Sequence, residues 1–375
     1  MMISFFRFID KYLIWFFLLI FFRLKHIPFV NKNKIKQSPK KILVIRLWAL
    51  WSSLLTFPMI KQLKDHYWDN IQYDLLASTR NIWVFKNQWY FQNMFNLFSL
   101  KDLLKLVISF KKYDLVIDVE EYFRTSTLMA LWLGKVSIGY SNLKIRKLWY
   151  TDPVYYQDQQ HTILTFLDLL NPLGIKWEAP KALEKYHYKT DKLDLVDQLL
   201  HQHRSSYKIV MHTGGAETAP ERFWAVENWI ALIKKLLDDN KSIKIFLSGT
   251  AFESASIQQI LTQLDDNYLK YVIDLSGKMN LDQFAYFLEK MDLMVSNDTG
   301  PMHLSAAMGT KTIGLFGPNL PQRFGAYPLD YNINLYHGDG TGYINAHLGE
   351  FKACSAEIIN AISVDEVSTT ILDLI

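Results

Sequence analysis

Apolar runs separated by amphipathic stretches recur along most of the chain. Continuous apolar runs rich in β-branched residues are typical of buried parallel strands. In the first half such runs lie at 41–47, 71–77 and 113–119. Apolar residues at helical spacing predict helices at 52–66, 124–133 and 161–170. This alternation of strands and helices predicts an α/β domain in the first half.

The alternation restarts after a polar stretch at 181–206, which contains an amphipathic helix and bridges two halves. Strands are expected at 207–213, 243–248, 271–275, 293–296 and 312–316, with helices between them and a last helix at 363–374. Because ligands of open α/β sheets bind at the carboxyl ends of strands, we expect two Rossmann-like domains facing a cleft that holds the site. The expected segments are 1–40, 41–190 for the N-terminal domain, 191–360 for the C-terminal domain and 361–375 for a C-terminal helix.

An N-terminal hydrophobic helix is the expected exception to this pattern. Residues 12–22 are eleven consecutive apolar residues, which as a helix span about 16 Å against a hydrocarbon core of about 30 Å. Aromatic residues beside Lys and Arg favour the membrane interface. We therefore expect the segment to lie on the membrane surface, with a true span and a helix packed on the protein body as alternatives.

Charge supports that interpretation. The chain has 375 residues and a net charge of +4, and residues 1–41 hold nine Lys or Arg and one acid. That segment carries +8 and the remainder −4, so the basic charge is poor evidence for a nucleic-acid partner. The basic linker at 31–41 is expected to face anionic lipid from the cytoplasm. The single cysteine, Cys354, excludes an intramolecular disulfide and a cysteine-based zinc site.

The stretch 295–327 carries the clearest chemical signal. It predicts a buried strand, an Asp-Thr-Gly-Pro turn, a short helix of small residues, a second strand and a Gly-Pro loop. A turn at a helix N-terminus presents backbone N–H groups to an anion. Pro301 suits the first helical position, and His303 lies on the first turn. Asp298 is expected either to bond a ligand hydroxyl or to cap the helix.

A second cluster follows the strand at 207–213. Thr213 and Gly214 end that strand, and glycine there allows a ligand to approach the backbone closely. Arg222 ends the following loop, where a guanidinium can clamp a diphosphate, unless it pairs with Glu221 or Glu227. After the next strand, Glu253 is expected either to hold a ribose or base edge or to start its helix.

The N-terminal half offers weaker candidates. Ser52 and Ser53 follow its first strand and read as helix-capping residues at a cleft position. Asp118 stands near the end of the strand at 113–119 and Glu120 and Glu121 follow it, where carboxylates either face the cleft or pair with Arg124. The sequence has no Asp-X-Asp pair at a strand end, no His-rich metal spacing and no P-loop, so we expect no metal in the site.

Together these motifs resemble the family 9 glycosyltransferases, the lipopolysaccharide heptosyltransferase group. The resemblance covers about residues 40–375 and is carried by SNDTGPMHLSAAMGTKTIGLFGP, ERFWAVENW, KILVIRLWALWSSLLTFP, DLVIDVEEYFRTSTLMALWLG and the IGY that follows. It implies a glycosyltransferase B fold whose C-terminal half binds the donor and whose N-terminal half binds the acceptor. The residues expected at the donor are Thr213, Gly214, Arg222, Glu253, Asp298, Thr299, Gly300, Pro301, Met302 and His303.

The resemblance also implies the reaction. Family members move a heptose from ADP-heptose to the inner core of lipopolysaccharide, with inversion and without a metal or cofactor. We therefore expect a nucleotide-sugar donor, a lipid-linked glycan acceptor and a peripheral or monotopic place on the cytoplasmic face of the inner membrane. A sugar-nucleotide epimerase on a similar fold is a further alternative.

One departure from the family matters for catalysis. The family usually carries Gly-Asp after the first strand, with the Asp as general base, and here Trp51 and Ser52 stand there. A serine near its normal pKa is a poor base. Three alternatives follow: Glu120, Glu121 or Asp118 takes the proton, leaving-group stabilisation dominates, or the chain binds sugar nucleotide with weak or no transfer.

Overall fold

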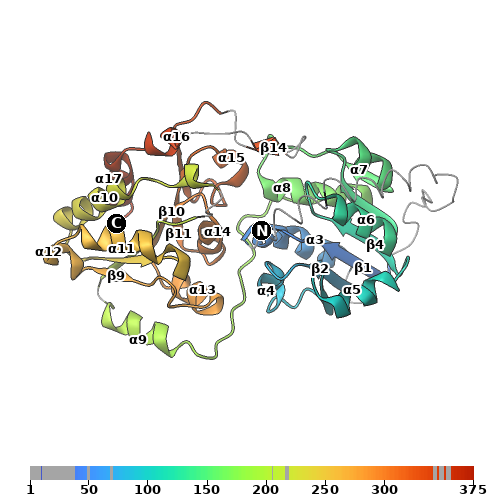
Figure 1. Cartoon of the computed structure of the whole chain (residues 1–375), viewed down its shortest axis with the longest axis horizontal. Coiled ribbons are helices and arrows are strands. Elements are labelled where there is room, and N and C mark those ends of the chain that lie inside the picture. Colours follow the sequence, from blue (N-terminus) through green and yellow to red (C-terminus); the bar gives the residue numbers. More distant parts are fainter. Residues whose placement is uncertain are drawn as a thin grey trace. The chain divides into compact units, whose positions relative to one another are not determined.

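The computed structural model describes residues 10, 39–48, 51–67, 71–204, 206–215, 219–340, 344–345, 350–351 and 356–375. The chain divides into two compact units (Figure 1). Unit 1 is Met1–Pro180 with Asn345–Glu350, and unit 2 is Lys181–Ile344 with Phe351–Ile375. Each unit is built on one six-stranded sheet whose neighbouring strands are all parallel.

In unit 1 the strands lie in the order β3-β2-β1-β4-β5-β6. Their bounds are β1 Lys41–Ile45, β2 Gln72–Ala77, β3 Asn93–Asn96, β4 Tyr113–Asp118, β5 Gly134–Tyr140 and β6 Asp152–Val154. The helices are η2 Trp51–Thr56, α3 Phe57–Tyr67, α4 Ile82–Phe85, α5 Leu100–Val107, α6 Arg124–Leu133, α7 Lys144–Trp149, α8 Thr162–Leu167 and η3 Asp168–Leu173.

In unit 2 the strands lie in the order β12-β11-β10-β7-β8-β9. Their bounds are β7 Tyr207–His212, β8 Ile243–Ser248, β9 Val272–Asp274, β10 Leu293–Asn297, β11 Lys311–Phe316 and β12 Ile333–Tyr336. The helices are α9 Asp194–Gln202, η4 Pro220–Arg222, α10 Val226–Asp239, η5 Ala251–Glu253, α11 Ser254–Thr262, α12 Asp266–Leu269, α13 Leu281–Glu289, α14 Gly300–Ala307, α15 Pro321–Phe324, α16 Glu357–Asn360 and α17 Val364–Leu372. Two short strands, β13 Ile344–Asn345 and β14 Glu350–Phe351, pair with each other.

Both sheets share one topology. Numbered within its own unit, each sheet has the order 3-2-1-4-5-6, which is the doubly wound Rossmann arrangement. The order reverses between β1 and β4 in unit 1 and between β7 and β10 in unit 2. Ligands of such sheets bind outside the carboxyl ends of the strands at this switch point. The expected α/β fold with two Rossmann-like units is confirmed.

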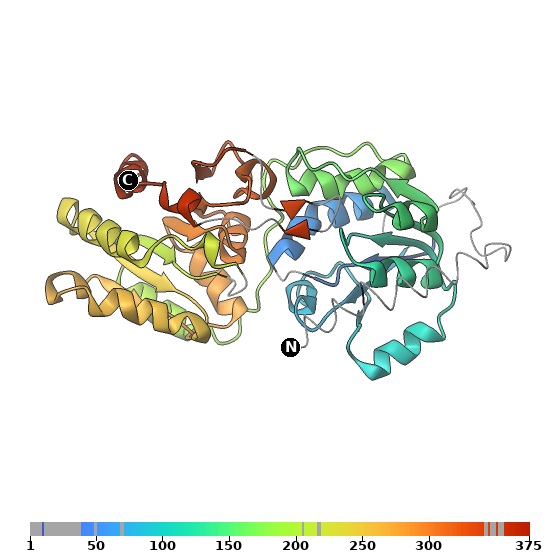
Figure 2. The same ribbon diagram turned by 45° about the horizontal axis from the view of Figure 1, so that its top comes forward.

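Apolar burial explains why these segments form the sheets. The central strand β1 has four consecutive fully buried residues, 42–45, and β10 is buried along its whole length. The last helix of the chain belongs to unit 2, where α17 contributes Val367 and Ile371 to the same core as Leu232 and Leu236 of α10. Figures 1 and 2 show α17 beside α10.

Several weaker strands escape the sequence pattern. The sequence predicts neither β3, with sequence NMFN, nor β5, β6 and β12. These strands flank the strong central strands and lack a continuous apolar run, and β6 contains Pro153, which suits an edge position. They form because neighbouring strands supply hydrogen bonds, which a local pattern does not encode.

Within the first 38 residues the structure describes Asp10 alone, so the predicted hydrophobic helix lies outside the described residues. The Asp10 carboxylate accepts hydrogen bonds from the backbone N–H of Arg124 at 3.1 Å and of Thr125 at 2.7 Å. Helix α6 has no side-chain cap of its own at Phe123, so Asp10 takes that role. Within the described residues, no helix is long and apolar enough to cross a membrane.

Candidate active site

The strongest candidate residues gather at the switch point of unit 2. Thr213 and Gly214 follow the end of β7, and Asp298 follows the end of the neighbouring strand β10. A Cβ built on Gly215 would lie 3.2 Å from the Thr299 side chain, so the two loops are in contact. The parallel pairing of β7 with β10 therefore brings together motifs about 85 residues apart in the sequence.

Arg222 pairs with Asp298 across this point. Arg222 Nη1 lies 3.6 Å from Asp298 Oδ2, and the Arg222 side chain is 22% exposed while that of Asp298 is 5% exposed. Asn319 Nδ2 also donates to Asp298 Oδ2, at 2.5 Å. Burial raises the pKa of Asp298, and the positive charge of Arg222 opposes that rise. Arg222 thus pairs with an acid that follows the neighbouring strand, and its side chain stays partly exposed.

Helix α14 begins beside this pair. Its N-cap residue is Thr299 and not Asp298, and the Thr299 side chain makes no cap bond. Because the helix begins at Gly300, Pro301 is its second residue and not its first. A helix N-terminus of this kind offers unbonded backbone N–H groups and a partial positive charge to an anion. Pro301 and Met302 are buried, and Met302 packs near Gly314 of the sheet.

His303 lies one turn into α14 and is 5% exposed. Within the described residues, its Nδ1 atom is buried and has no hydrogen-bond partner. Burial lowers the pKa of His303 to about 4, so the ring is neutral at pH 7. His303 can therefore offer a phosphate or sugar a hydrogen bond but not a positive charge.

Glu253 approaches the backbone of Gly214. A Cβ on Gly214 would lie 2.0 Å from Glu253 Oε1, so only glycine leaves room for this carboxylate. Glu253 Oε2 accepts from the Thr250 N–H at 2.6 Å in a capping box. Its Oε1 lies 3.8 Å from Nε2 of the buried His212. Glu253 thus caps its helix and also borders the candidate site.

Two asparagines that the sequence analysis did not single out hold these loops together. Asn297 is fully buried, and its Nδ2 donates to the carbonyl oxygens of Thr213 at 2.8 Å and Gly214 at 3.2 Å. Its Oδ1 accepts from the Trp224 N–H at 3.3 Å. Asn297 fixes the β7 loop to β10 as Asn319 fixes Asp298. Both lie within residues 295–327. Asn297 ends the buried strand β10, a position that could have singled it out from the sequence, and Asn319 lies in the loop after β11.

Unit 1 has a polar cluster at its own switch point. Glu120 follows β4, and its Oε1 accepts from the backbone N–H of Leu47 at 2.6 Å and of Trp48 at 2.9 Å, just after β1. Arg46 Nη1 lies 3.8 Å from the same oxygen. Burial raises the pKa of Glu120 to about 7. Glu120 therefore fixes the backbone at Leu47 and Trp48, where the loop that leads to Ser52 begins.

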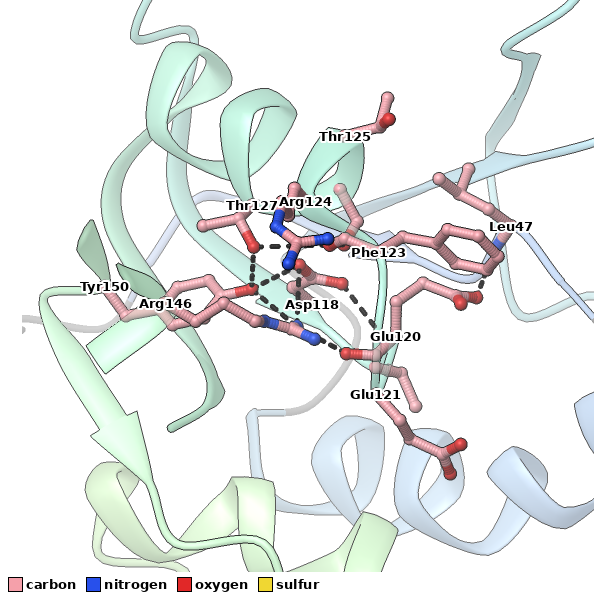
Figure 3. A network of polar contacts seen from close by, with 12 residues as sticks. Leu47, Asp118, Glu120, Glu121, Phe123, Arg124, Thr125, Thr127, Arg146 and Tyr150 are labelled. Atoms are coloured by element: carbon pink, nitrogen blue, oxygen red, sulfur yellow. Dashed lines mark hydrogen bonds and ion pairs between the residues drawn. The ribbon is translucent and has the colours of Figure 1, made fainter. Parts of the chain in front are cut away.

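Asp118 pairs with Arg146 and not with the expected Arg124, whose Nη1 lies 3.9 Å from Asp10 Oδ2. Arg146 Nη2 lies 3.4 Å from Asp118 Oδ2 and 2.8 Å from the Tyr150 hydroxyl, and that hydroxyl donates to Asp118. Figure 3 shows these three side chains turned toward one another and the Glu121 carboxylate directed away from them. In the part of the chain that the structure describes, the Glu121 carboxylate makes no hydrogen bond or ion pair.

The three acids of unit 1 therefore differ in access. Asp118 and Glu120 are 0% and 2% exposed, whereas Glu121 is half-buried. Ser52 is half-buried in η2. Ser53 is fully buried, and Asn81 Nδ2 lies 3.2 Å from its hydroxyl. Of these acids, Glu121 alone combines an accessible carboxylate with freedom from the buried network.

The arrangement as a whole suits anion binding in unit 2 and proton acceptance in unit 1. Among the described residues, no group of three or more His, Cys, Asp or Glu side chains is placed to hold a metal ion. Two doubly wound units in one chain, each with polar residues at the carboxyl ends of its central strands, define the glycosyltransferase B architecture.

Comparison with known proteins identifies the family. The sequence profile of glycosyltransferase family 9 (heptosyltransferase) matches residues 104–340, and the chain belongs to this family. The lipopolysaccharide core heptosyltransferase OpsX of Haemophilus influenzae is 24% identical over 321 residues, 80% of this chain and 86% of that protein. The protein is therefore a glycosyltransferase, as its motifs predict.

Solved structures agree on the fold. The family 9 glycosyltransferase from Veillonella parvula aligns with a TM-score of 0.75 and 18% identity, over 91% of this chain and 99% of that one. The E. coli ADP-heptose lipopolysaccharide heptosyltransferase II aligns with a TM-score of 0.70 and 18% identity, over 89% and 98% of the two chains.

Proposed function

We propose that this enzyme transfers a heptose from ADP-heptose to the lipopolysaccharide core or another lipid-linked glycan, with inversion and without a metal ion. Membership of a family described as heptosyltransferases supports the sugar, and the E. coli relative named for ADP-heptose supports the donor. The observation that carries the proposal is the contact of Arg222 and Asp298 beside the α14 N-terminus, with Gly214 on the neighbouring loop.

In this proposal unit 2 binds the donor diphosphate. The backbone N–H groups of Thr299 and Gly300 and the guanidinium of Arg222 bond the phosphate oxygens, and neutral His303 adds a hydrogen bond. An acceptor hydroxyl attacks the anomeric carbon as the bond to the diphosphate breaks, and that electron pair passes to a phosphate oxygen. Fixed donors aimed at this oxygen stabilise the charge that develops in the transition state.

We propose that Glu121 is the general base, which takes the proton of the acceptor hydroxyl. A general base must reach its substrate and be unprotonated at working pH. Glu120 has its Oε1 bound by two backbone N–H groups, and Asp118 is held by Arg146 and Tyr150. The Glu121 carboxylate makes no such hydrogen bond or ion pair among the described residues. Glu120 then acts as a positioning residue that holds the loop after β1, and Ser52 contacts the acceptor without taking its proton.

Ser52 stands where the family usually has an Asp, and this difference favours one alternative. In that alternative the protein binds sugar nucleotide with weak or no transfer. A thermal-shift panel of nucleotides and sugar nucleotides identifies the donor, because a ligand that binds only the folded state raises its stability. Transfer from the donor that binds, to a lipid-linked core acceptor, then decides between the two. Tight donor binding without transfer to any acceptor would favour the binding protein.

The base assignment has its own test. Glu121→Gln should lower kcat about a hundredfold or more with donor affinity unchanged, since general-base catalysis contributes at least that factor. Ser52→Asp in the same chain should restore part of kcat, because it returns the carboxylate of the family pattern. Glu178→Gln is the matched control, an exposed acid of unit 1. A kcat for Glu121→Gln equal to that of the control would rule out Glu121 as the base.

We also propose that the enzyme works at the cytoplasmic face of the inner membrane. The apolar run 12–22 and the basic residues around it support a peripheral or monotopic attachment.

A further inference from the structure

Helix α5 of unit 1 turns an apolar stripe outward. Leu100, Leu104, Val107 and Ile108 are 73%, 59%, 52% and 83% exposed. Their spacing of four, three and one places them on one face of the helix, which continues through Ile108 in helical conformation. A regular stripe of large exposed aliphatic residues on a folded helix marks an interaction surface.

The opposite face holds α5 on the body of unit 1. Leu106 is buried and Leu103 packs against the same core, which includes residues of β4 and α6. At the C-terminal end of the helix, Trp132 Nε1 of α6 donates to the Val107 carbonyl oxygen at 2.9 Å. The helix is therefore fixed on unit 1 by its other face, and its outward stripe is exposed among the described residues of that unit. Figure 2 shows α5 at the edge of this unit.

Positive charge flanks the stripe. Residues 98–112 contain four lysines and one acid, Asp102. Lys101, Lys105 and Lys112 are exposed. Asp102 is engaged within the helix start, where it accepts from the Asn96 N–H at 3.1 Å and lies 4.0 Å from Lys105. The surface therefore combines a net positive charge with aliphatic side chains.

Aromatic rings lie at both ends of the stripe. Phe98 precedes the helix and is 46% exposed, and Phe110 follows it and is 44% exposed. The Phe110 ring packs on that of Trp132 at a centroid distance of 4.7 Å. Aromatic rings and lysines around an apolar helix face are the composition that the boundary between lipid headgroups and acyl chains selects.

We propose that this α5 surface, formed by Leu100, Leu104, Val107 and Ile108 with Lys101, Lys105 and Lys112, docks on a bilayer that contains anionic lipid. The stripe enters the boundary between headgroups and acyl chains, about 5–10 Å deep, and the lysines meet lipid phosphates. Charge complementarity favours this occupant over a second copy of the chain, which would bring equal lysines against one another. The inference extends the membrane placement proposed above and does not depend on the sugar donor.

A fluorescent label tests insertion directly. In a full-length Cys354→Ser chain, Leu104→Cys or Leu195→Cys carries an environment-sensitive dye; Leu195 is an exposed leucine of α9 in unit 2. With phosphatidylglycerol–phosphatidylcholine vesicles that contain doxyl lipid, the dye at 104 should shift to the blue and be quenched, and the dye at 195 should not. Bound protein with no quenching at 104, equal quenching at both sites, or no vesicle binding at all overturns the proposal.

Vesicle co-sedimentation provides a second test. Leu104→Gln with Ile108→Gln should lower binding to anionic vesicles about tenfold relative to Leu195→Gln, since the apolar contact with the acyl boundary is lost. Lys101→Gln with Lys105→Gln should weaken binding to anionic vesicles but not to neutral ones, and high salt should have the same effect. Equal melting temperatures confirm that the variants fold.

A spectral change at 104 that depends on protein concentration without vesicles would point to a second copy instead and overturn the membrane assignment. None of these measurements uses sugar transfer, so the docking surface and the proposed activity can fail separately.

Discussion

Arg222→Ala isolates the guanidinium that the proposed diphosphate site needs. A charged hydrogen bond to a phosphate contributes about 1.5–3 kcal/mol, so its loss should raise the Kd for ADP and for ADP-heptose about 10- to 150-fold. Because the lost contact is to the diphosphate, the nucleotide with and without its sugar should lose similar affinity. The turnover number should also fall, since the same group meets the charge on the leaving phosphate.

Removal of the guanidinium should also cost the fold. Arg222 lies 3.6 Å from Asp298, whose side chain is only 5% exposed, and a buried carboxylate that loses its partner destabilises the folded state more than a broken surface ion pair does. Asp298 also keeps its hydrogen bond from Asn319. Removal of the guanidinium should raise the pKa of Asp298 further, because its charge opposes the effect of burial.

Isothermal titration calorimetry with ADP and ADP-heptose measures the loss, and a melting curve without ligand measures the cost to the fold. Arg204→Ala is the matched control, an exposed arginine of the same unit. Arg222→Lys should recover part of the affinity, because it keeps the charge but not the planar fork. A Kd for Arg222→Ala within twofold of the wild-type value would refute the assignment of Arg222 to the diphosphate.

Three further predictions follow from contacts in the two units. Gly214→Ala should displace the Glu253 carboxylate and so weaken donor binding in calorimetry. The fold should lose only about 1 kcal/mol of stability, which is the contribution of the capping box. Unchanged donor affinity would place Glu253 outside the donor site. Glu120 has a folded-state pKa of about 7, above its ordinary 4.5, so its contribution to stability is complete below pH 4.5 and is lost as pH rises through 7. Hydrogen exchange of β1 and β4 amides measures the free energy of unfolding of unit 1. Between pH 4.5 and pH 7 this free energy should fall by about 3 kcal/mol more in the wild type than in Glu120→Gln. Curves of free energy against pH that run parallel for the two proteins would contradict this. Asp10→Ala should destabilise unit 1 by about 1–2 kcal/mol in urea unfolding, because α6 loses its cap. Removal of residues 1–30 should destabilise it at least as much. A urea midpoint equal to that of the wild type would show that the cap contributes nothing.

The Asp10 prediction gives the N-terminal segment a role in the fold besides the membrane attachment that the sequence predicts. Asp10 is buried and bonds the first N–H groups of α6, more than 110 residues away in the sequence. A single carboxylate before the apolar run at 12–22 gave no indication of this contact, because its partners, which are two backbone N–H groups, the Thr125 hydroxyl and the Arg124 guanidinium, are distant in the sequence.

The sequence by itself determined the fold class and pointed to the motifs that are proposed to bind the donor. The strands with continuous apolar runs, β1, β4, β7, β8, β10 and β11, were predicted because full burial on both faces of a sheet selects such runs. The turn at 298–301 and the loop ending at Arg222 were also predicted, since glycine, proline and arginine carry local conformational and chemical signals. These motifs were sufficient to suggest the family that the comparisons then confirmed.

Only the tertiary structure decided which residues meet. Strand order places β1 beside β4 and β7 beside β10, and hydrogen bonds between distant strands leave no trace in local periodicity. That order joins Arg222 to Asp298, assigns Asn297 and Asn319 to loop positioning, and keeps His303 neutral through burial. It also separates the acids of unit 1, because burial and backbone N–H partners depend on what packs around a side chain and not on its own residue type.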